Sequence, residues 1–400
     1  MTLLSVEQIR QAAARLDGVL TPTALEVSDS LSALAGREIW LKHEERQRTG
    51  SYKIRGAYNK IAQLAPGTEV VAASAGNHAQ GVARAARLTG CKATIFMPSS
   101  AALPKVAATR ADGADVRLEG AVVDESIAAA REYAGSVGAT FVHPFDDPVV
   151  MAGQGTVGLE IATGCPANAT VVVPVGGGGL VSGVATAIAA ELPEASVIGV
   201  EASGAAAVRA SLDRGEVVSL DRVETIADGI AVRTTTPLIL EHVRARVADV
   251  VTVDDDQTSA AMLTLLERAK TVVEPAGAVG LAAVLAGRIP GSGPVVCLLS
   301  GGNVDPLLLI RLIEHGLSSA GRYLVLRVIL ADQPGALAAL TGAVAEMGLN
   351  VLEVEHHRVG LALGVDRVEV LLTVETRDPE HRAETVRALE ARGFTVELLT

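Results

Sequence analysis

One lysine stands in a setting that favours covalent chemistry. Lys53 lies in the segment T-G-S-Y-K-I-R-G, residues 49–56, at the predicted start of a helix, directly after Tyr52 and two residues before Arg55. A second cation close to a partly desolvated lysine lowers the lysine pKa and makes its amine a better nucleophile. Because a helical lysine is far more often a solvated surface charge, this indication depends on the segments that accompany it.

Three further segments combine glycine with small polar residues. They are S-A-G-N-H-A-Q-G at residues 74–81, P-V-G-G-G-G-L-V-S-G at residues 174–183 and S-G-G-N-V-D at residues 300–305. Backbone N–H groups at the start of a helix bind anions, so the first two segments are candidate anion sites. The four consecutive glycines fit neither the G-x-G-x-x-G spacing nor the G-K-[ST] ending of a P-loop, which favours a phosphate monoester over a dinucleotide.

The elements that must position these segments are short apolar strands followed by helices. Strands are expected at Val70–Ala73, Ala93–Met97, Thr170–Val175, Ser196–Val200 and Val295–Leu299. Their alternation with helical patterns predicts an α/β fold with a mostly parallel sheet, whose ligands bind at the carboxyl ends of the strands. A lysine, two anion-binding loops and Ser300 at that edge describe a site for a phosphorylated aldehyde cofactor held as a Schiff base.

The chain from Arg322 onward has a different pattern. Strands are expected at Arg322–Leu330, Asn350–Arg358, Arg367–Glu375 and Phe394–Leu399, and helices at Ala336–Met347 and Pro379–Arg392. This β-α-β-β-α-β order is that of the ferredoxin-like fold. The segment Gly316–Gly321, with two serines and two glycines, is expected to be a linker before it.

The composition excludes several other classes of protein. The 400 residues carry a net charge of −12 without a basic stripe, which argues against a nucleic-acid partner. No apolar run is long enough to span a membrane, and Ser5 with Gln8 predicts a capping box that opens a helix rather than a signal peptide. The three cysteines stand far apart, as is typical of reduced thiols in a cytoplasmic protein, and the histidines form no metal-binding pattern.

These segments resemble the fold type II family of pyridoxal-phosphate enzymes and, within it, the threonine and serine dehydratases. The resemblance covers Val19 to about Leu317 and includes T-I-A-D-G-I-A-V, V-E-P-A-G-A and L-L-S-G-G-N. It implies pyridoxal phosphate as the cofactor and a catalytic domain at residues 1–318 with two open parallel-sheet subdomains, as in the tryptophan synthase β-like fold. The smaller subdomain would span about residues 41–145.

The resemblance also implies roles for individual residues. Lys53 would hold the cofactor and act as the base, and Ser300 would bond the pyridine nitrogen as a neutral partner. Asn77 would bond the ring hydroxyl, and Tyr52, where relatives usually have Phe, would lie against the ring. Further cofactor contacts are expected from Gly176, Gly177, Gly178, Gly179, Leu180, Gly229 and Glu274. The substrate carboxylate would be surrounded by Ser74, Ala75, Gly76, Asn77 and His78.

The C-terminal part resembles an ACT domain through the segment A-D-Q-P-G-A-L and the later G-L-N at residues 348–350. The resemblance implies a regulatory domain at residues 322–400 whose sheet pairs side by side with that of a second subunit, in a dimer or a tetramer. An amino-acid effector such as isoleucine or valine would bind near Asp332, Gly335, Ala336 and Asn350. A purely structural dimerisation module is the alternative.

The resemblance implies elimination of water from L-threonine to give 2-oxobutanoate and ammonia, and from L-serine to give pyruvate. Serine racemase is the nearest alternative, but racemases of this family carry a serine at the position of Ala75, and a methyl group cannot take a proton. The resemblance also points to a divalent-cation site, of which this chain retains Glu201 but has Ala207 in place of an acidic ligand. We therefore expect no tightly bound metal there.

Four other questions stay open at this point. Threonine synthase and cysteine synthase would share the cofactor loops, although the segment around Lys53 and Thr225–Ile230 favours the dehydratases by resemblance. A catalytically inactive amino-acid sensor is a further alternative. The sequence fixes neither the preference for threonine over serine nor a biosynthetic rather than a catabolic role.

Overall fold

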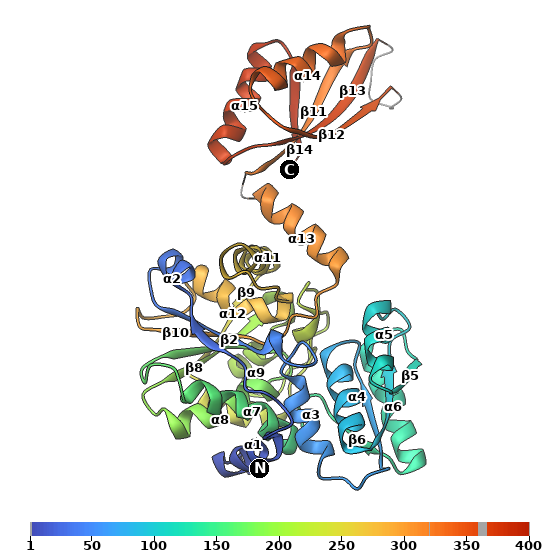
Figure 1. Ribbon diagram of the computed structural model, residues 1–400, viewed down its shortest axis with the longest axis vertical. Coiled ribbons are helices and arrows are strands. Elements are labelled where there is room, and N and C mark those ends of the chain that lie inside the picture. The colour runs from blue at the N-terminus through green and yellow to red at the C-terminus, as the bar shows by residue number, and fades with distance from the viewer. Residues whose placement is uncertain (1, 320, 359–365, 400) are drawn as a thin grey trace. The chain divides into compact units, whose positions relative to one another are not determined.

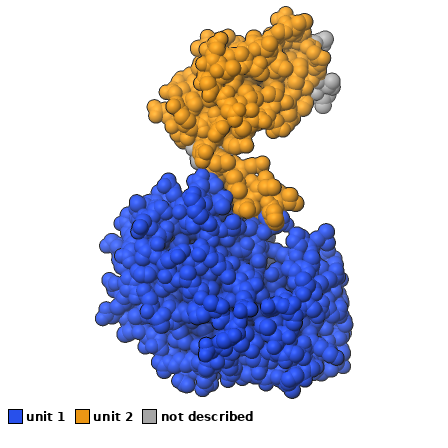
Figure 2. Space-filling view, viewed as in Figure 1, with its two compact units in different colours: residues 1–305 blue, residues 306–400 orange. Residues whose placement is uncertain are grey.

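The computed structural model describes residues 2–319, 321–358 and 366–399 (Figure 1). It contains two compact units, residues 1–305 and 306–400, which Figure 2 shows in different colours. The second unit begins with α13 (Pro306–Ser319), most of which the sequence assigned to the catalytic domain. The linker expected from Gly316 is wrong for residues 316–319, because helix α13 continues to Ser319. A glycine near the end of a helix costs too little to stop it.

The large lobe of the first unit is built on a six-stranded sheet. Its strands are, in spatial order, β1 (Leu25–Val27), β2 (Ile39–His43), β10 (Val295–Leu299), β7 (Thr170–Pro174), β8 (Ser196–Ala202) and β9 (Asp249–Val253). All neighbours run parallel except β1, which is antiparallel to β2. The sequence predicted β7, β8 and β10, whereas β1, β2 and β9 are short or carry charged residues that interrupt the apolar run.

Helices cover both faces of this sheet (Figure 1). They are α1 (Val6–Leu16), α2 (Asp29–Ala35), α7 (Pro148–Ala162), α8 (Gly179–Glu191), α9 (Ala207–Arg214), α10 (Pro237–Arg246), α11 (Asp255–Thr264) and α12 (Pro275–Leu285), with shorter turns η1 (Glu44–Arg46), η2 (Ser203–Ala205), η3 (Asp228–Ile230) and η4 (Leu265–Ala269). Val171 and Val173 of β7 join the core formed with α7 and α8, whereas Val172 lies against Gly280 of α12. This alternation is that of a strand buried on both sides.

The small lobe is a four-stranded parallel sheet. Its strands are, in spatial order, β5 (Asp115–Leu118), β4 (Lys92–Met97), β3 (Glu69–Ala73) and β6 (Thr140–Phe141). Its helices are α4 (Asn77–Thr89), α5 (Leu103–Ala111) and α6 (Val123–Val137). Val70 and Ala72 lie in the core with α4, whereas Val71 and Ala73 lie in the core with α6. The expected arrangement of two parallel-sheet subdomains is confirmed.

One further helix links these parts of the first unit. α3 (Lys53–Ile61) packs against both α4 and α7 and so lies between the lobes. α1 packs on α7 and opens with the expected capping box between Ser5 and Gln8. In the described part of the chain, no helix is long and apolar enough to cross a membrane.

The second unit contains α13 and an antiparallel sheet with the order β12-β13-β11-β14. Along the chain its elements are β11 (Tyr323–Ala331), α14 (Ala336–Glu346), β12 (Val351–His357), β13 (Arg367–Glu375), α15 (Pro379–Ala391) and β14 (Thr395–Leu399). Leu324, Leu326 and Val328 alternate with more exposed residues and form one apolar core with Leu340 and Leu389 of the two helices. The predicted β-α-β-β-α-β order is confirmed.

Candidate active site

Lys53 is the first residue of α3, as predicted, and lies beside the end of β10. Its Nζ atom donates a 3.2 Å hydrogen bond to the carbonyl oxygen of Pro144 and lies 5.2 Å from the centre of the Tyr52 ring. The backbone N–H of Tyr52 donates to the carbonyl oxygen of Ser300 at 3.1 Å. The turn before α3 is therefore fixed to the carboxyl end of β10, which brings Lys53 and Ser300 into one region.

Arg55 does not provide the neighbouring cation that the sequence predicted for Lys53. Its guanidinium group bonds both oxygens of Glu44 at 2.7 and 2.8 Å and pairs with Glu160 at 2.6 Å. Burial lowers the pKa of Arg55, but the charges of Glu44 and Glu160 outweigh it and raise that pKa above its ordinary value. Two carboxylates neutralise the guanidinium, and one of them lies 105 positions away in the chain, where the local sequence does not reveal it.

The glycine loop, residues 176–179, is packed so closely that only glycine fits. A Cβ atom at Gly176 would lie 2.9 Å from Ile230 Cα, and one at Gly178, whose φ is +95°, would overlap Ile239 Cγ2. Gly178 is the N-cap of α8, and no side chain caps this helix. The N–H groups of the first turn thus lack a side-chain acceptor and form a site for an anion. This arrangement fits the phosphate of the expected cofactor.

Phe145 closes the glycine loop on one side. A Cβ atom at Gly177 would overlap the Phe145 ring, and one at Gly179 would lie 2.9 Å from its backbone. The preceding residue, Pro144, accepts the hydrogen bond from Lys53. The segment from Pro144 to Phe145 therefore connects the lysine to the glycine loop.

Asn77 and Glu274 form a polar contact between the lobes. Asn77 Nδ2 donates to Glu274 Oε1 at 2.6 Å, and Asn77 Oδ1 accepts from Asn303 Nδ2 at 2.8 Å. A Cβ atom on Gly229 would lie 3.5 Å from Glu274 Oε1, so three of the expected cofactor residues form one cluster. Burial and the charge of Asp228 raise the pKa of Glu274 to about 7.

Ser300 borders this cluster at the carboxyl end of β10. Only 3% of its surface is exposed. A Cβ atom on the next residue, Gly301, would lie 3.1 Å from Asn77 Nδ2. The structure therefore brings Ser300, Asn77 and Glu274 together, as the motifs predicted.

The loop expected at the substrate carboxylate, residues 74–78, connects β3 to α4. The N–H of Gly76 donates to Ser74 Oγ at 3.1 Å, and Ala75 is half-buried. His78 is buried and donates from Nε2 to the carbonyl oxygen of Val142 at 2.9 Å. Burial and the charge of Lys53 lower the pKa of His78 to about 3, so its ring is neutral at pH 7. This loop offers N–H groups and neutral side chains to a carboxylate, and no cation of its own.

Four contributors to the site have no role in the sequence-based prediction. Pro144 acts through its carbonyl oxygen and Phe145 through packing, and neither leaves a signal in the sequence. Asp228 acts through its charge on Glu274. Asn303 stands in the recognised segment S-G-G-N-V-D, which could have pointed to its bond with Asn77.

Glu201, which the resemblance led us to compare with a cation site, is engaged by backbone groups. Its two oxygens each accept a 2.8 Å hydrogen bond, from the N–H groups of Val208 and Arg209 at the start of α9. Burial raises its pKa to about 7 despite these bonds. Among the described residues, no group of three or more His, Cys, Asp and Glu side chains is placed to hold a metal ion.

In the second unit, the residues expected at an effector site lie at opposite ends of one domain. Asp332, Gly335 and Ala336 belong to the turn from β11 to α14, whereas Asn350 lies between α14 and β12. Asn350 accepts a hydrogen bond from the backbone of Glu375, which pairs with the first residue of β11. The nine residues of β11 therefore separate Asn350 from Asp332, by roughly 25–30 Å. A single chain does not bring these residues together.

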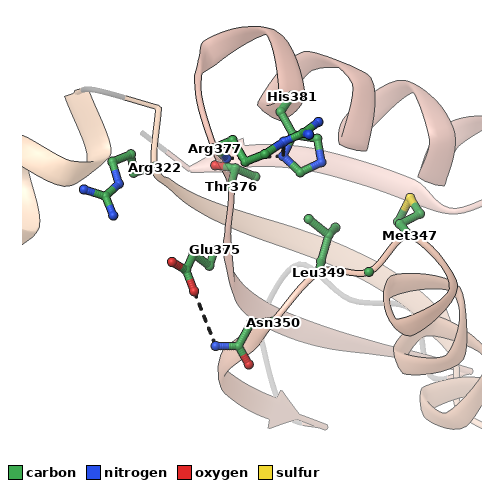
Figure 3. A pocket seen from close by; sticks show the side chains of 9 residues that line it. Arg322, Met347, Leu349, Asn350, Glu375, Thr376, Arg377 and His381 are labelled. Carbon is green, nitrogen blue, oxygen red and sulfur yellow. Dashed lines mark hydrogen bonds between the residues drawn. The ribbon is translucent and has the colours of Figure 1, made fainter.

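A pocket of about 620 Å³ lies at the Asn350 end of this unit (Figure 3). Asn350 Nδ2 donates to Glu375 Oε2 at 3.4 Å on one side of it. Arg377 and His381 lie on another side, where Arg377 Nε donates to His381 Nδ1 at 3.3 Å. Leu349 lies between them (Figure 3). The pocket therefore presents charges of both signs around an apolar side chain.

Comparison with known proteins identifies the family. A family model described as pyridoxal-phosphate dependent enzyme matches residues 16–301, and a model of the ACT domain matches residues 324–392. The chain therefore belongs to the family of pyridoxal-phosphate-dependent enzymes, uses pyridoxal phosphate as its cofactor and carries a C-terminal ACT domain. The L-threonine ammonia-lyase of Thermotoga maritima is 46% identical over 400 residues, which cover 99% of this chain and all of that protein.

Solved structures agree with this assignment and add an alternative activity. The processed form of threonine deaminase isoform 2 from Solanum lycopersicum is 36% identical, with a TM-score of 0.73, over 77% of this chain and 87% of that one. Maize serine racemase is 34% identical, also with a TM-score of 0.73, over 80% of this chain and 99% of that one. Since both fit equally well, the fold alone does not separate elimination from racemisation.

Proposed function

We propose that this chain is a threonine ammonia-lyase, which eliminates water from L-threonine. The released aminocrotonate then takes up one water molecule and yields 2-oxobutanoate and ammonia. The observation that carries the proposal is the gathering of Lys53, the uncapped glycine loop and the Asn77–Glu274 pair around the ends of β3, β7 and β10. The similarity to an L-threonine ammonia-lyase over the full length supports the same reaction.

The residues of this site would hold pyridoxal phosphate as follows. Lys53 would hold it covalently, the N–H groups from Gly176 to Leu180 would bind its phosphate, and Ser300 would bond its ring nitrogen. Its ring would be bordered by Tyr52, Asn77, Gly229 and Glu274. When bound, the cofactor supplies an electron sink for the bond that breaks at the substrate Cα atom.

Lys53 is the residue that moves the proton in this proposal. Its amine, placed at the start of α3 by the bond to Pro144, takes the proton from Cα. Ser300 would be a neutral partner of the ring nitrogen and would not keep that nitrogen protonated, as an aspartate would. Negative charge at Cα would therefore be stabilised less strongly by the bound cofactor than it would be beside a carboxylate. The site therefore favours prompt loss of the β-hydroxyl group.

L-Serine is proposed as a second substrate, which would yield pyruvate. It shares the carboxylate, the amino group and the β-hydroxyl group of threonine and lacks only one methyl group. An apolar contact to one methyl or methylene group distinguishes substrates by only about 1–3 kcal/mol. We therefore expect slower turnover of serine, and no strict exclusion.

Racemisation is disfavoured by Ala75. It requires a second proton-accepting group that faces Cα from the side opposite Lys53, and relatives that racemise serine carry a serine at this position. The methyl group of Ala75, in the half-buried loop between β3 and α4, can neither accept nor give a proton.

The ACT domain is proposed to regulate this activity by binding an amino acid such as isoleucine or valine. In the pocket of Figure 3, Arg377 can bond a carboxylate and Glu375 an ammonium group, while Leu349 contacts an aliphatic side chain. Calorimetric titration of the full chain with each amino acid tests this assignment. Arg377→Ala should weaken binding more than tenfold, and Arg382→Ala on α15 is the matched control.

The same titration separates the two locations considered for the effector. Weaker binding in Asp332→Ala, with no change in Arg377→Ala, would place the effector at the turn after β11 instead. The absence of any binding would make the domain a structural module. We also infer a cytoplasmic homo-oligomer, a dimer or a tetramer, which sedimentation of the purified protein checks.

The proposed reaction is tested with the purified enzyme loaded with pyridoxal phosphate. L-Threonine should yield 2-oxobutanoate and ammonia in equal amounts, and L-serine should yield pyruvate with a lower kcat/KM. Formation of D-serine from L-serine without an oxo acid would instead assign racemase activity.

A further inference from the structure

An ion pair joins the two lobes beside the candidate active site. Lys105 Nζ, on α5 of the small lobe, lies 2.5 Å from Asp228 Oδ2, on η3 of the large lobe. The Lys105 side chain is only 18% exposed, whereas that of Asp228 is 59% exposed. The lysine is therefore held within the protein, and the carboxylate lies nearer to solvent.

The Lys105 ammonium group faces the loop of residues 74–78. A Cβ atom built on Gly76 would lie 3.9 Å from Lys105 Nζ. Asp228 is followed by Gly229, which packs against Glu274. Both charges also act on Glu274, whose pKa is raised by Asp228 and lowered by Lys105. The ion pair therefore lies where the loop meets the cofactor-binding residues.

The loop itself lacks a positive charge for an anionic substrate. Its N–H groups are neutral donors, and His78 is neutral at pH 7. An amino acid brings a full negative charge on its α-carboxylate into this partly buried region, and such a charge is stable there only when it is paired. Lys105 is the cation that the structure places beside Gly76.

We propose that Lys105 binds the α-carboxylate of the amino-acid substrate and that Asp228 holds the lysine in position when no substrate is present. The incoming carboxylate replaces that of Asp228 as the partner of Nζ, while the N–H groups of residues 74–78 bond its oxygens. This assignment rests on the proposed function, since it requires an amino-acid substrate at this loop.

If this assignment is correct, substitutions of Lys105 and Asp228 have different effects on KM for L-threonine. Lys105→Met removes the carboxylate partner, so KM for L-threonine should rise at least about tenfold, while kcat changes by less than about threefold. Asp228→Asn removes the competing carboxylate, so KM should stay the same or fall. Lys105→Arg retains the charge and should restore most of the affinity.

A matched control separates binding from stability. Arg84 of α4 pairs at 3.1 Å with Asp112, which caps the end of α5 opposite to Lys105. Arg84→Met breaks this ion pair of α5 and leaves residues 74–78 unchanged. This variant should leave KM unchanged. Equal increases of KM in Lys105→Met and Asp228→Asn would overturn the proposal, because the ion pair would then act only by joining the lobes.

A second readout identifies the group that Lys105 binds and does not need turnover. Propionate has the carboxylate but no amino group, and its binding to the holoenzyme is measured by saturation-transfer NMR. Lys105→Met should weaken propionate binding by the same factor as it raises KM. Unchanged propionate binding would contradict the assignment. If the wild-type enzyme turned over no amino acid, the proposed function would fail while this measurement still tested Lys105.

Discussion

The side-chain amide of Asn77 donates a 2.6 Å hydrogen bond to the carboxylate of Glu274. Asn77 is the first residue of α4 in the small lobe, and Glu274 is the N-cap of α12 in the large lobe. The bond therefore aligns the start of one helix with the start of another across the site. Since Asn303 also bonds Asn77, the amide is held at both ends.

Glu274 should make the stability of the cofactor-free protein depend on pH. Burial and Asp228 raise its pKa from an ordinary 4.5 to about 7, so the folded state prefers the protonated carboxyl. The unfolded chain ionises first, and stability therefore falls as pH rises from about 4.5 to about 7. Glu274→Gln keeps an acceptor for Asn77 and should gain about 1–3 kcal/mol relative to wild type at pH 8 but little at pH 4.5.

Thermal unfolding of both proteins across this pH range checks the prediction. The difference between the two melting temperatures should grow with pH up to about pH 7 and then stay constant. A difference that is the same at every pH would show that Glu274 does not titrate in this window.

Gly178→Ala should impair cofactor binding specifically. Its φ of +95° is unfavourable for alanine, and the added Cβ would overlap Ile239 Cγ2, so the loop that forms the phosphate site must shift. The dissociation constant for pyridoxal phosphate should rise at least about tenfold. Gly215→Ala is the control, because Gly215 also has a positive φ of +77° but meets only Arg244 Nη2 at 3.8 Å. Equal effects of the two substitutions on cofactor binding would contradict the role of the loop.

Arg55→Met should destabilise the fold rather than alter the chemistry of Lys53. The substitution leaves the fully buried carboxylate of Glu44 without its guanidinium partner, which costs about 3–5 kcal/mol. Arg10→Met breaks an exposed pair with Glu191 and should cost less than about 1 kcal/mol. Urea unfolding of both variants measures the difference, and similar small losses would mean that Arg55 is not essential to this buried network.

Ala75→Ser tests why the enzyme is expected to eliminate water rather than racemise. A hydroxyl at this position adds a group that can exchange a proton with Cα, so a low rate of D-serine formation from L-serine should appear. The wild-type enzyme should form none within detection. Chiral chromatography of the product measures both rates, and D-serine from the wild type at a rate comparable to pyruvate would refute the argument from Ala75.

The sequence predicted which segments lie together at the candidate site where this depends on position along one strand. Ser74, the glycine loop after Pro174, and Ser300 each follow a recognisable parallel strand, and parallel strands end at a common edge. Lys53 was recognisable because its segment opens a helix. These features are local, so pattern and spacing suffice to find them.

Interactions between distant segments could not be predicted in this way. The partner of Arg55 on α7, the carbonyl of Pro144 and the pair of Lys105 with Asp228 arise only when the lobes are packed together. The C-terminal effector residues illustrate the same limit, because the distance between Asp332 and Asn350 depends on the antiparallel course of β11 and α14.

The most direct test of the proposed function compares the wild-type protein with Lys53→Ala. After loading with pyridoxal phosphate and removal of the excess, the wild type should retain the visible absorption of the bound cofactor and release ammonia and 2-oxobutanoate from L-threonine. Lys53→Ala should lose at least about a thousandfold in kcat/KM, because the residue that holds the cofactor and moves the proton is absent. A Lys53→Ala protein that turns over L-threonine at a rate near that of the wild type would contradict the account.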